Sequence, residues 1–232
     1  MAQFEIEGLR LDVPDAHLTA RIRAKLASGG YEALEARAAL MRLRPGQRVL
    51  ELGAGTGFIA CLCARVAGAE NVTTVEANPD LLPVIDGNLV RNGVAGVTVL
   101  HGAVGGMEGG TAPLAFDAAR SFWAGHIADA TSRAGRVVEV PNLGLGPLLA
   151  QARPGLVIMD IEGAEAHLFD APWPAHVKTV VMELHPARYP DTVIRRIVDC
   201  MSASGLTYDP GPSRGRILCF RRVRGQQAND AG

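Results

Sequence analysis

Apolar and polar residues along this chain follow two spacings in turn, and together these spacings predict strands separated by helices. Residues 48–52, 72–76 and 156–160 are short and largely apolar, which is typical of strands buried on both faces. Residues 58–67 and 80–91 are longer and repeat apolar side chains at helical spacing. This alternation predicts a doubly wound α/β fold, with a mostly parallel sheet and helices on both faces.

The remaining expected elements complete a sheet of seven strands. Residues 206–208 and 216–223 are expected to form an antiparallel pair that ends the sheet. The others are strands at 97–100 and 178–184, helices at 16–27, 32–43 and 192–202, and an N-terminal hairpin over 4–13. Right-handed crossovers place the carboxyl ends of parallel strands along one edge, and ligands bind at that edge in such sheets.

A single domain is expected over the 232 residues. Residues 1–45 would form an N-terminal extension, 46–224 the α/β core, and 225–232 a frayed polar tail. Residues 102–145 break the alternation with paired glycines and one strand-like piece at 136–140. Because this stretch leaves a strand beside the ligand edge, it is interpreted as a substrate-side loop, with disorder as the alternative.

Composition and charge exclude several classes of protein. The chain has 23 basic and 24 acidic residues, a net charge of −1, which gives no general electrostatic footprint for nucleic acid or an anionic membrane. No apolar run is long enough to span a bilayer, and the N-terminus lacks a secretion signal. The four cysteines show neither disulfide nor metal spacing. We expect a cytoplasmic protein with reduced cysteines; the oligomeric state stays open, a homodimer included.

The first informative motif is a glycine loop after the strand at 48–52. Gly53, Gly55 and Gly57 are spaced G-x-G-x-G, Glu51 precedes them, and a helix follows. Glycine lets the backbone turn tightly and approach a ligand, and the helix start directs amide groups toward it. Dinucleotide-binding loops prefer G-x-G-x-x-G, so the spacing here favours a different nucleoside cofactor.

An acidic residue at the end of the next strand supports that reading. Glu76 ends the strand at 72–76, about twenty residues after the loop, where a carboxylate accepts both ribose hydroxyls of a nucleoside. The pairing of E-x-G-x-G-x-G with V-E-A-N-P resembles S-adenosylmethionine-dependent methyltransferases of the Rossmann-like class. Another kind of nucleotide-binding fold is the alternative.

Two later strands also end in polar residues at the same edge. Residues 160–165 read D-I-E-G-A-E, and residues 183–186 read E-L-H-P. With Tyr31-Glu32 upstream, these motifs resemble the FkbM family of methyltransferases over roughly residues 30–222. Family members often carry a lysine just before the aspartate, where this chain has Ile158-Met159.

The resemblance implies transfer of the sulfonium methyl group of S-adenosylmethionine to a hydroxyl of a small molecule, such as a sugar or a polyketide. Methyl transfer is an in-line displacement, so the protein has to hold nucleophile, methyl carbon and sulfur nearly collinear. A nucleic-acid or protein acceptor and a cofactor-binding scaffold without turnover are the alternatives. The acidic motif at 160–165 is a poor host for a phosphate backbone.

Three residues are candidates for the base that accepts the hydroxyl proton: His185, Asp160 and Glu162. An unperturbed imidazole titrates near neutrality, but His185 is equally interpreted as a structural residue that anchors its turn. Asp160 is expected to contact the cofactor or the acceptor. Glu165 is interpreted as a cap of the following helix start, where acidic residues are favoured.

The other candidate site residues are assigned by their place at the sheet edge and by the family resemblance. Expected cofactor contacts are Tyr31, Glu51, Gly53, Gly55, Gly57, Glu76, Ala77, Asn78, Gly102, Ala103 and Asp160. Asn78, which precedes a proline, has a helix cap as its alternative role. Expected acceptor contacts are Trp123, His126 and Glu183. No metal is expected, because no full ligand set is evident from the sequence.

Overall fold

The computed structural model describes residues 1–118, 125–128 and 136–223. Trp123 and the expected tail at 225–232 lie outside the described residues. Within the described chain, no helix is both long and apolar enough to cross a lipid bilayer.

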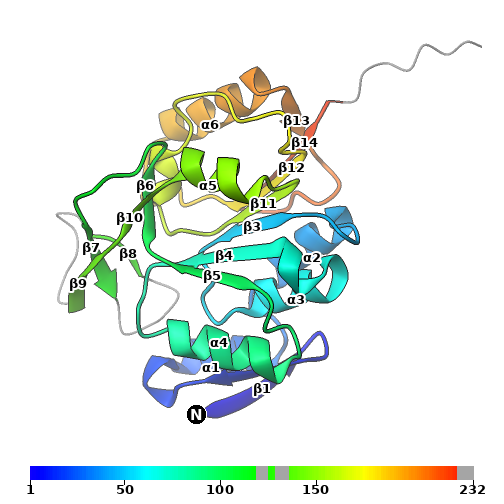
Figure 1. Ribbon diagram of the computed structural model, residues 1–232, viewed down its shortest axis with the longest axis vertical. Coiled ribbons are helices and arrows are strands. Elements are labelled where there is room, and N and C mark those ends of the chain that lie inside the picture. The colour runs from blue at the N-terminus through cyan, green and yellow to red at the C-terminus, as the bar shows by residue number, and fades with distance from the viewer. Residues whose placement is uncertain (119–124, 129–135, 224–232) are drawn as a thin grey trace, which may run out of the picture.

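A seven-stranded sheet forms the centre of the molecule (Figure 1). Its order is β13 (Leu206–Tyr208), β14 (Ile217–Arg222), β12 (Thr179–Glu183), β11 (Leu156–Met159), β3 (Val49–Leu52), β4 (Val72–Glu76) and β5 (Thr98–His101). β14 runs antiparallel to both of its neighbours, and the remaining pairs are parallel. The α/β fold predicted from the sequence is confirmed. β3, the first of these strands in the chain, lies inside the sheet, so the strand order reverses beside it.

Alternate residues of the central strands face two different layers. Val49, Ile158 and Val181 pack with the helices α2 (Ala33–Arg42), α3 (Phe58–Ala67) and α4 (Leu82–Arg91). Leu50 and Val157 face the opposite layer, which contains α5 (Leu145–Ala152) and α6 (Asp191–Ala203). Both faces of the sheet are therefore covered, as near-continuous apolar strands require (Figure 1).

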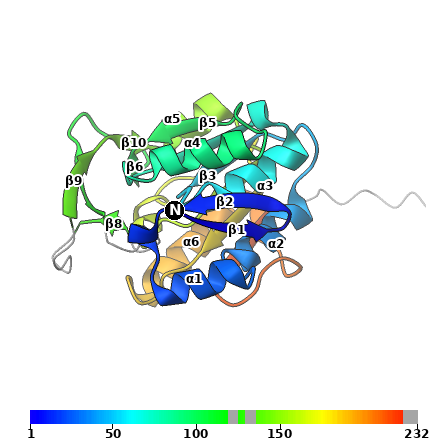
Figure 2. The ribbon, with the colours of Figure 1, turned by 90° about the horizontal axis from the view of Figure 1, so that it is seen from below.

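The N-terminal hairpin joins β1 (Ala2–Ile6) to β2 (Leu9–Val13) through a two-residue turn with positive φ at Glu7 and Gly8. Figure 2 shows the hairpin at the outside of the molecule, next to α1 (Ala20–Ala27). The helix expected at 16–27 begins only at Ala20, because the Thr19 hydroxyl caps it by accepting a hydrogen bond from the Ile22 amide (3.2 Å). A separate 3₁₀ turn, η1 (Asp15–His17), precedes it.

The segment expected as one long loop is partly strand. β6 (Ala103–Gly106) pairs in parallel with β10 (Asn142–Gly144), and β7 (Leu114–Ala118) pairs antiparallel with β8 (His126–Ile127) and β9 (Arg136–Val140). β9 coincides with the strand-like piece expected at 136–140, whereas the other four strands and α5 were not expected. Two short 3₁₀ turns complete the described elements, η2 (Ala69–Asn71) and η4 (Ala164–His167).

Candidate functional site

The carboxyl ends of β3, β4, β5 and β11 surround one cavity. Backbone hydrogen bonds hold these ends together: the Gly53 amide donates to the Val75 carbonyl (2.9 Å), and the Asp160 amide donates to the Leu52 carbonyl (3.0 Å). Nine sequence-predicted residues line this cavity, which we call the cofactor cavity: Tyr31, Gly53, Gly55, Glu76, Ala77, Gly102, Ala103, Asp160 and Glu162.

Two glycines shape the loop above β3. Gly53 has φ of +90°, and a Cβ there would lie 1.9 Å from the Asp160 carbonyl oxygen. Gly55 has φ of +55°, and a Cβ there would lie 2.8 Å from the Tyr31 hydroxyl. The backbone therefore passes closer to its neighbours than any side chain permits, which explains why the loop needs glycine at both positions.

Glu76 faces the cofactor cavity from the end of β4. Its carboxylate accepts hydrogen bonds from the Gly55 amide (2.9 Å) and the Asn78 amide (2.7 Å). Burial raises the pKa of Glu76 to about 7, although several backbone amides counter that rise. An ionised carboxylate is a hydrogen-bond acceptor only, so Glu76 is suited to hydroxyl donors of a ligand.

Three predicted cofactor contacts do not line the cavity. Glu51 is buried beneath it and accepts a hydrogen bond from the Thr74 hydroxyl (2.5 Å); burial raises its pKa to about 8. Gly57 precedes α3 and fits against Ile85. Asn78 accepts a hydrogen bond from the Asp80 amide (3.1 Å), the capping role given as its alternative.

A cover formed by the small sheet of β7, β8 and β9 closes the cofactor cavity. Phe116, Gly125 and Ile127 contribute to the lining, whereas the predicted acceptor residue His126 does not. These residues place the cover directly against the space in which a ligand would bind.

A second cavity opens beside the first, and we call it the acidic cleft. It holds about 480 Å³. Its inner, half-buried charged residues are the carboxylates Glu32, Glu35, Asp160, Glu162 and Glu183, and its exposed cations are Arg21, Lys25 and Arg216. Tyr31, Asp160 and Glu162 line both cavities, so the two meet at these side chains.

His185 lies at the base of the acidic cleft in a buried network. Its Nδ1 is 2.7 Å from Glu165 Oε1, which also accepts a hydrogen bond from the Tyr189 hydroxyl (2.7 Å). The Tyr189 hydroxyl in turn accepts a hydrogen bond from the His185 amide (2.8 Å), and Glu165 Oε2 accepts one from the Gly163 amide (2.9 Å). Glu165 thus accepts a hydrogen bond from the backbone at the start of the short helical turn, as expected of a capping residue. Its other oxygen holds the His185 imidazole in one orientation.

The other imidazole nitrogen faces two carboxylates. His185 Nε2 is 3.5 Å from Asp160 Oδ1 and 3.5 Å from Glu162 Oε2. Burial lowers the pKa of His185, but the carboxylates outweigh it and raise that pKa to about 9. Burial also raises the pKa of Asp160 and of Glu162, against the opposing charge of His185. The three predicted base candidates therefore form one interacting cluster.

Backbone strain is concentrated at the acidic cleft. Four non-glycine residues of the described chain have positive φ: Glu7, Glu32, Arg153 and Glu162. Glu32 (φ 46°) and Glu162 (φ 52°) both belong to the cleft. Positive φ costs a non-glycine residue free energy, and such costs persist at sites where the surrounding structure fixes the conformation.

Comparison with known proteins places the glycine loop among methyltransferases. A family model described as protein-L-isoaspartate(D-aspartate) O-methyltransferase matches residues 27–119, less than half of the chain. Over these residues the chain is similar to methyltransferases. The match covers the glycine loop and Glu76, and it agrees with the prediction of S-adenosylmethionine as the cofactor.

Curated relatives match over similarly short segments. A protein-L-isoaspartate O-methyltransferase of Methanococcoides burtonii is 40% identical over 63 residues, 27% of this chain and 31% of that protein. A ribosomal protein L11 methyltransferase of Pelotomaculum thermopropionicum is 44% identical over 61 residues, 26% of this chain and 20% of that protein. The chain therefore matches about a third or less of the length of these relatives.

Solved structures align over most of the chain at low identity. A precorrin-6y C5,15-methyltransferase from Geobacter metallireducens has a TM-score of 0.46 and 14% identity, covering 92% of this chain and 93% of that one. A ribosomal protein L11 methylase from Lactobacillus delbrueckii subsp. bulgaricus has a TM-score of 0.45 and 10% identity, covering 84% of this chain and 80% of that one.

The residues of the cofactor cavity fit S-adenosylmethionine by their chemistry. Gly53 and Gly55 line the cavity with backbone alone, and Glu76 presents a buried carboxylate suited to ribose hydroxyls. Asp160 Oδ1 is buried without a hydrogen-bond partner in the described chain, at the border with the acidic cleft. A carboxylate oxygen without a hydrogen bond there suits a cationic group.

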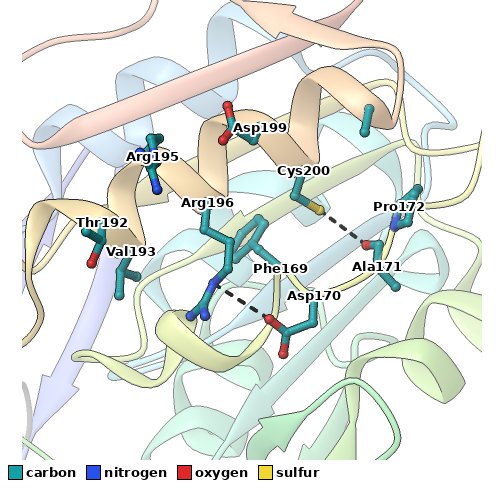
Figure 3. A pocket seen from close by; sticks show the side chains of 11 residues that line it. Phe169, Asp170, Ala171, Pro172, Thr192, Val193, Arg195, Arg196, Asp199 and Cys200 are labelled. Carbon is teal, nitrogen blue, oxygen red and sulfur yellow. Dashed lines mark hydrogen bonds and ion pairs between the residues drawn. The ribbon is translucent and has the colours of Figure 1, made fainter.

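A third cleft lies elsewhere and holds about 620 Å³. Figure 3 shows it between α6 and residues 169–172, with the Arg196 and Asp170 side chains paired across it (3.6 Å) and Cys200 Sγ directed at the Ala171 carbonyl (3.2 Å). None of the sequence-predicted site residues lines this cleft. Its size therefore does not make it the site of the predicted chemistry.

Tyr189 and Glu35 are among the site residues that sequence reasoning missed. Tyr189 supports Glu165 from the start of the α6 region, and Glu35 lines the acidic cleft from α2. Glu32 and Glu35 are three residues apart at the start of a helix, a spacing that places side chains on one face. That spacing was available as a signal for Glu35, whereas no sequence pattern linked Tyr189 to Glu165.

Proposed function

We propose that this protein is an S-adenosylmethionine-dependent methyltransferase that methylates a hydroxyl group of a small molecule. The observation that carries the proposal is the meeting of the cofactor cavity and the acidic cleft at Tyr31, Asp160 and Glu162. A methyl donor held in the first cavity and an acceptor held in the second would face each other across these side chains. In-line displacement needs this opposed arrangement.

The cofactor side of the site binds through groups that the fold fixes in advance. When bound, S-adenosylmethionine supplies an electrophilic methyl group on a sulfonium. Glu76 would hold the ribose hydroxyls, and Gly53 and Gly55 would allow the loop to approach the ligand. Gly102 and Ala103 would lie beside the adenine ring of the cofactor. Asp160 would place its carboxylate near the sulfonium, where it holds the reacting end in position.

The acceptor side favours neutral molecules rich in hydroxyl groups. Ionised carboxylates are acceptors only, and hydroxyls are donors that satisfy them. Asp160 and Glu162 stand at the inner end of the acidic cleft, next to the cofactor cavity. A phosphate backbone or an isoaspartyl carboxylate would meet like charge there, which disfavours nucleic acid and the acceptor named for the matching family model.

The cluster of His185, Asp160 and Glu162 is the group that would take the hydroxyl proton. Glu165 and Tyr189 fix the imidazole so that Nε2 points between the two carboxylates. A positioned acid–base group typically contributes about 10²–10⁴-fold to such a reaction. Glu183, at the end of β12, and His126, in the cover, are further proposed acceptor contacts.

The FkbM resemblance supports this choice of acceptor, since its motifs D-I-E-G-A-E and E-L-H-P supply the cluster and the cleft. A protein acceptor is the second candidate, because the matching relatives are named for proteins that methylate isoaspartyl residues or ribosomal protein L11. The two candidates differ in which cellular fraction would carry the transferred methyl group.

The proposal is tested by incubating the protein with S-adenosylmethionine labelled on its methyl group and with host extract separated into small-molecule, protein and nucleic-acid fractions. We expect label in the small-molecule fraction, lost with Glu76→Ala and retained with Glu70→Ala, an exposed acid outside both cavities. Label in protein would favour the second candidate. Cofactor binding without transfer to any fraction would contradict the enzyme proposal and favour a scaffold.

A further inference from the structure

The cluster of Asp160, Glu162 and His185 has the composition of a three-ligand metal site. Each residue offers one ligand atom, and these atoms lie within 4.8 Å of one another. The two contacts made by His185 Nε2 are both 3.5 Å long. Ligand atoms bound tetrahedrally at about 2.0–2.2 Å from one ion are about 3.4 Å apart, so only small side-chain adjustments separate the cluster from a coordination sphere.

One unsatisfied buried atom distinguishes this cluster from an ordinary group of acidic side chains. Asp160 Oδ1 is buried and lacks a hydrogen-bond partner within the described chain. The His185 side chain is 6% exposed, and its Nε2 lies 3.5 Å from this oxygen and 3.5 Å from Glu162 Oε2. A buried polar atom without a hydrogen bond is costly, and a cation bound between the three side chains would satisfy it.

The support behind His185 is the kind found behind metal-bound histidines. A metal-bound histidine usually donates a hydrogen bond from the N–H of its second nitrogen, often to a carboxylate, and this bond fixes the ring orientation. Here Glu165, which is fully buried, accepts that hydrogen bond from Nδ1 at 2.7 Å and is itself held by Tyr189. This arrangement leaves Nε2 as the nitrogen available to a metal ion and directs it at Asp160 and Glu162.

We propose that Asp160, Glu162 and His185 bind a divalent cation that accepts both imidazole nitrogen and carboxylate oxygen, of the Mn²⁺ or Zn²⁺ kind. Two carboxylates and one imidazole leave coordination positions open, and these face the acidic cleft. A hydroxyl group of an acceptor is the natural occupant of an open position. Cation binding itself does not rest on the proposed function, because it needs neither cofactor nor turnover.

A neighbouring trio is the weaker candidate. Glu35, Asp160 and Glu183 also lie within 4.8 Å of one another, but Glu183 already pairs with Arg216 at 2.5 Å. That trio also lacks an imidazole and has no buried network behind it comparable to Glu165 and Tyr189. The two trios share Asp160, so variants of the unshared residues distinguish them.

The test is a titration of the full chain with MnCl₂ in the absence of cofactor, followed by electron paramagnetic resonance of free and bound Mn²⁺. We expect one saturable site, weakened at least tenfold by Asp160→Asn and by His185→Gln. Glu35→Gln, from the rival trio, and the surface variant Asp170→Asn are expected to bind as the wild type does. Thermal unfolding of each variant confirms that it is folded.

Pulsed measurement of the bound Mn²⁺ adds a direct signature, since a coordinated imidazole gives a nitrogen modulation that carboxylates and water do not. We expect this signal in the wild type and its loss in His185→Gln. Absence of a saturable site, a site without the nitrogen signal, or a site lost with Glu35→Gln but kept with His185→Gln would each overturn the proposal. Mn²⁺ binding without label transfer would instead count against the proposed function alone.

Discussion

At the scale of single residues, the buried carboxyl group of Glu51 is expected to make the stability of the folded protein depend on pH. It is 2% exposed, and burial raises its pKa from 4.5 to about 8. Between these values the folded state holds a proton that the unfolded state has released, so stability falls as pH rises. We predict that Glu51→Gln is more stable than the wild type at pH 8.5, with the difference shrinking toward pH 4.5. Urea unfolding at several pH values measures this.

The surface variant Glu70→Gln is the control for that comparison, because its side chain is exposed at the turn before β4. It is expected to follow the wild-type pH dependence. Parallel pH profiles for Glu51→Gln and the wild type would show that Glu51 is not held neutral in the folded protein.

Glu165 is a second residue whose burial has a measurable consequence. It accepts three hydrogen bonds, from Tyr189, Gly163 and His185, and none of its surface is exposed. Removing a buried acceptor leaves its donors unsatisfied, each at a cost of about 1–3 kcal/mol. We predict that Glu165→Ala lowers the free energy of unfolding by about 3–5 kcal/mol and Tyr189→Phe by about 1–2 kcal/mol. Equal losses in denaturant unfolding would contradict the shared network.

At the scale of elements, Gly53 is the contact between the β3 loop and the end of β11. A Cβ would lie 1.9 Å from the Asp160 carbonyl, which is backbone and cannot move aside cheaply. We predict that Gly53→Ala weakens binding of S-adenosylhomocysteine at least tenfold, measured by calorimetry, because the two strand ends are forced apart. Wild-type affinity would show that the loop adapts.

Gly87→Ala is the matched control for that variant. Gly87 lies in α4, where an added Cβ meets no atom within 4 Å. Alanine in a helix interior is favoured over glycine by about 0.5–1 kcal/mol, so this variant is expected to gain stability and keep its affinity.

Comparing predicted with observed helices and strands shows which of them could be predicted from the sequence. Val72–Glu76, Phe58–Ala67 and Leu206–Tyr208 coincide with their predicted bounds. β6 and β10 are short, contain glycine, and pair across 35 or so intervening residues, so their local pattern says little. α5 was not predicted because Gly146-Pro147 is a dipeptide typical of turns. Proline is nevertheless tolerated in the first turn of a helix, and this is where Pro147 lies.

The candidate site was predictable to the same extent. Glu76, Asp160 and His185 follow strongly apolar strands, so their place at the sheet edge follows from topology. The division into two cavities that meet at Tyr31, Asp160 and Glu162 depends on tertiary packing, and no spacing in the sequence contains it. The same holds for the bond between Glu165 and Tyr189.

The cover over the cofactor cavity gives a prediction at the same scale. Phe116 and Ile127 line the cofactor cavity from the sheet of β7, β8 and β9, so a bound ligand would contact this sheet. We predict that S-adenosylhomocysteine changes amide hydrogen exchange in residues 114–118 and 136–140. The hairpin of β1 and β2, which packs on α4, is expected to exchange unchanged. Unchanged exchange in both regions would show that the ligand enters without moving the cover.

At the scale of the whole molecule, the acidic cleft depends on parts that are distant in the chain. Tyr31 and Glu35 come from its N-terminal region, and Arg216 from the strand region that ends the sheet. A partly buried ion pair also joins these two regions: Arg42 in α2 contacts Asp209, which follows β13, at 2.5 and 2.7 Å. The two planar groups meet through two hydrogen bonds, the strongest geometry for such a pair.

This pair predicts acid sensitivity with a defined sign. Arg42 lowers the pKa of Asp209 below 3.8, so the pair stabilises the folded state above that pH and loses its contribution as the carboxylate is protonated at lower pH. Asp209 is 3% exposed, and we predict that Asp209→Asn lowers the free energy of unfolding at pH 7 by about 2–3 kcal/mol. Denaturant unfolding at pH 7 and pH 3 should show the difference from wild type shrinking in acid.

Asp15→Asn, which breaks a pair with Arg23 at the exposed surface, is the control and should change stability far less. A difference for Asp209→Asn that persists undiminished in acid would mean that packing, rather than the ion pair, ties the two ends of the fold together.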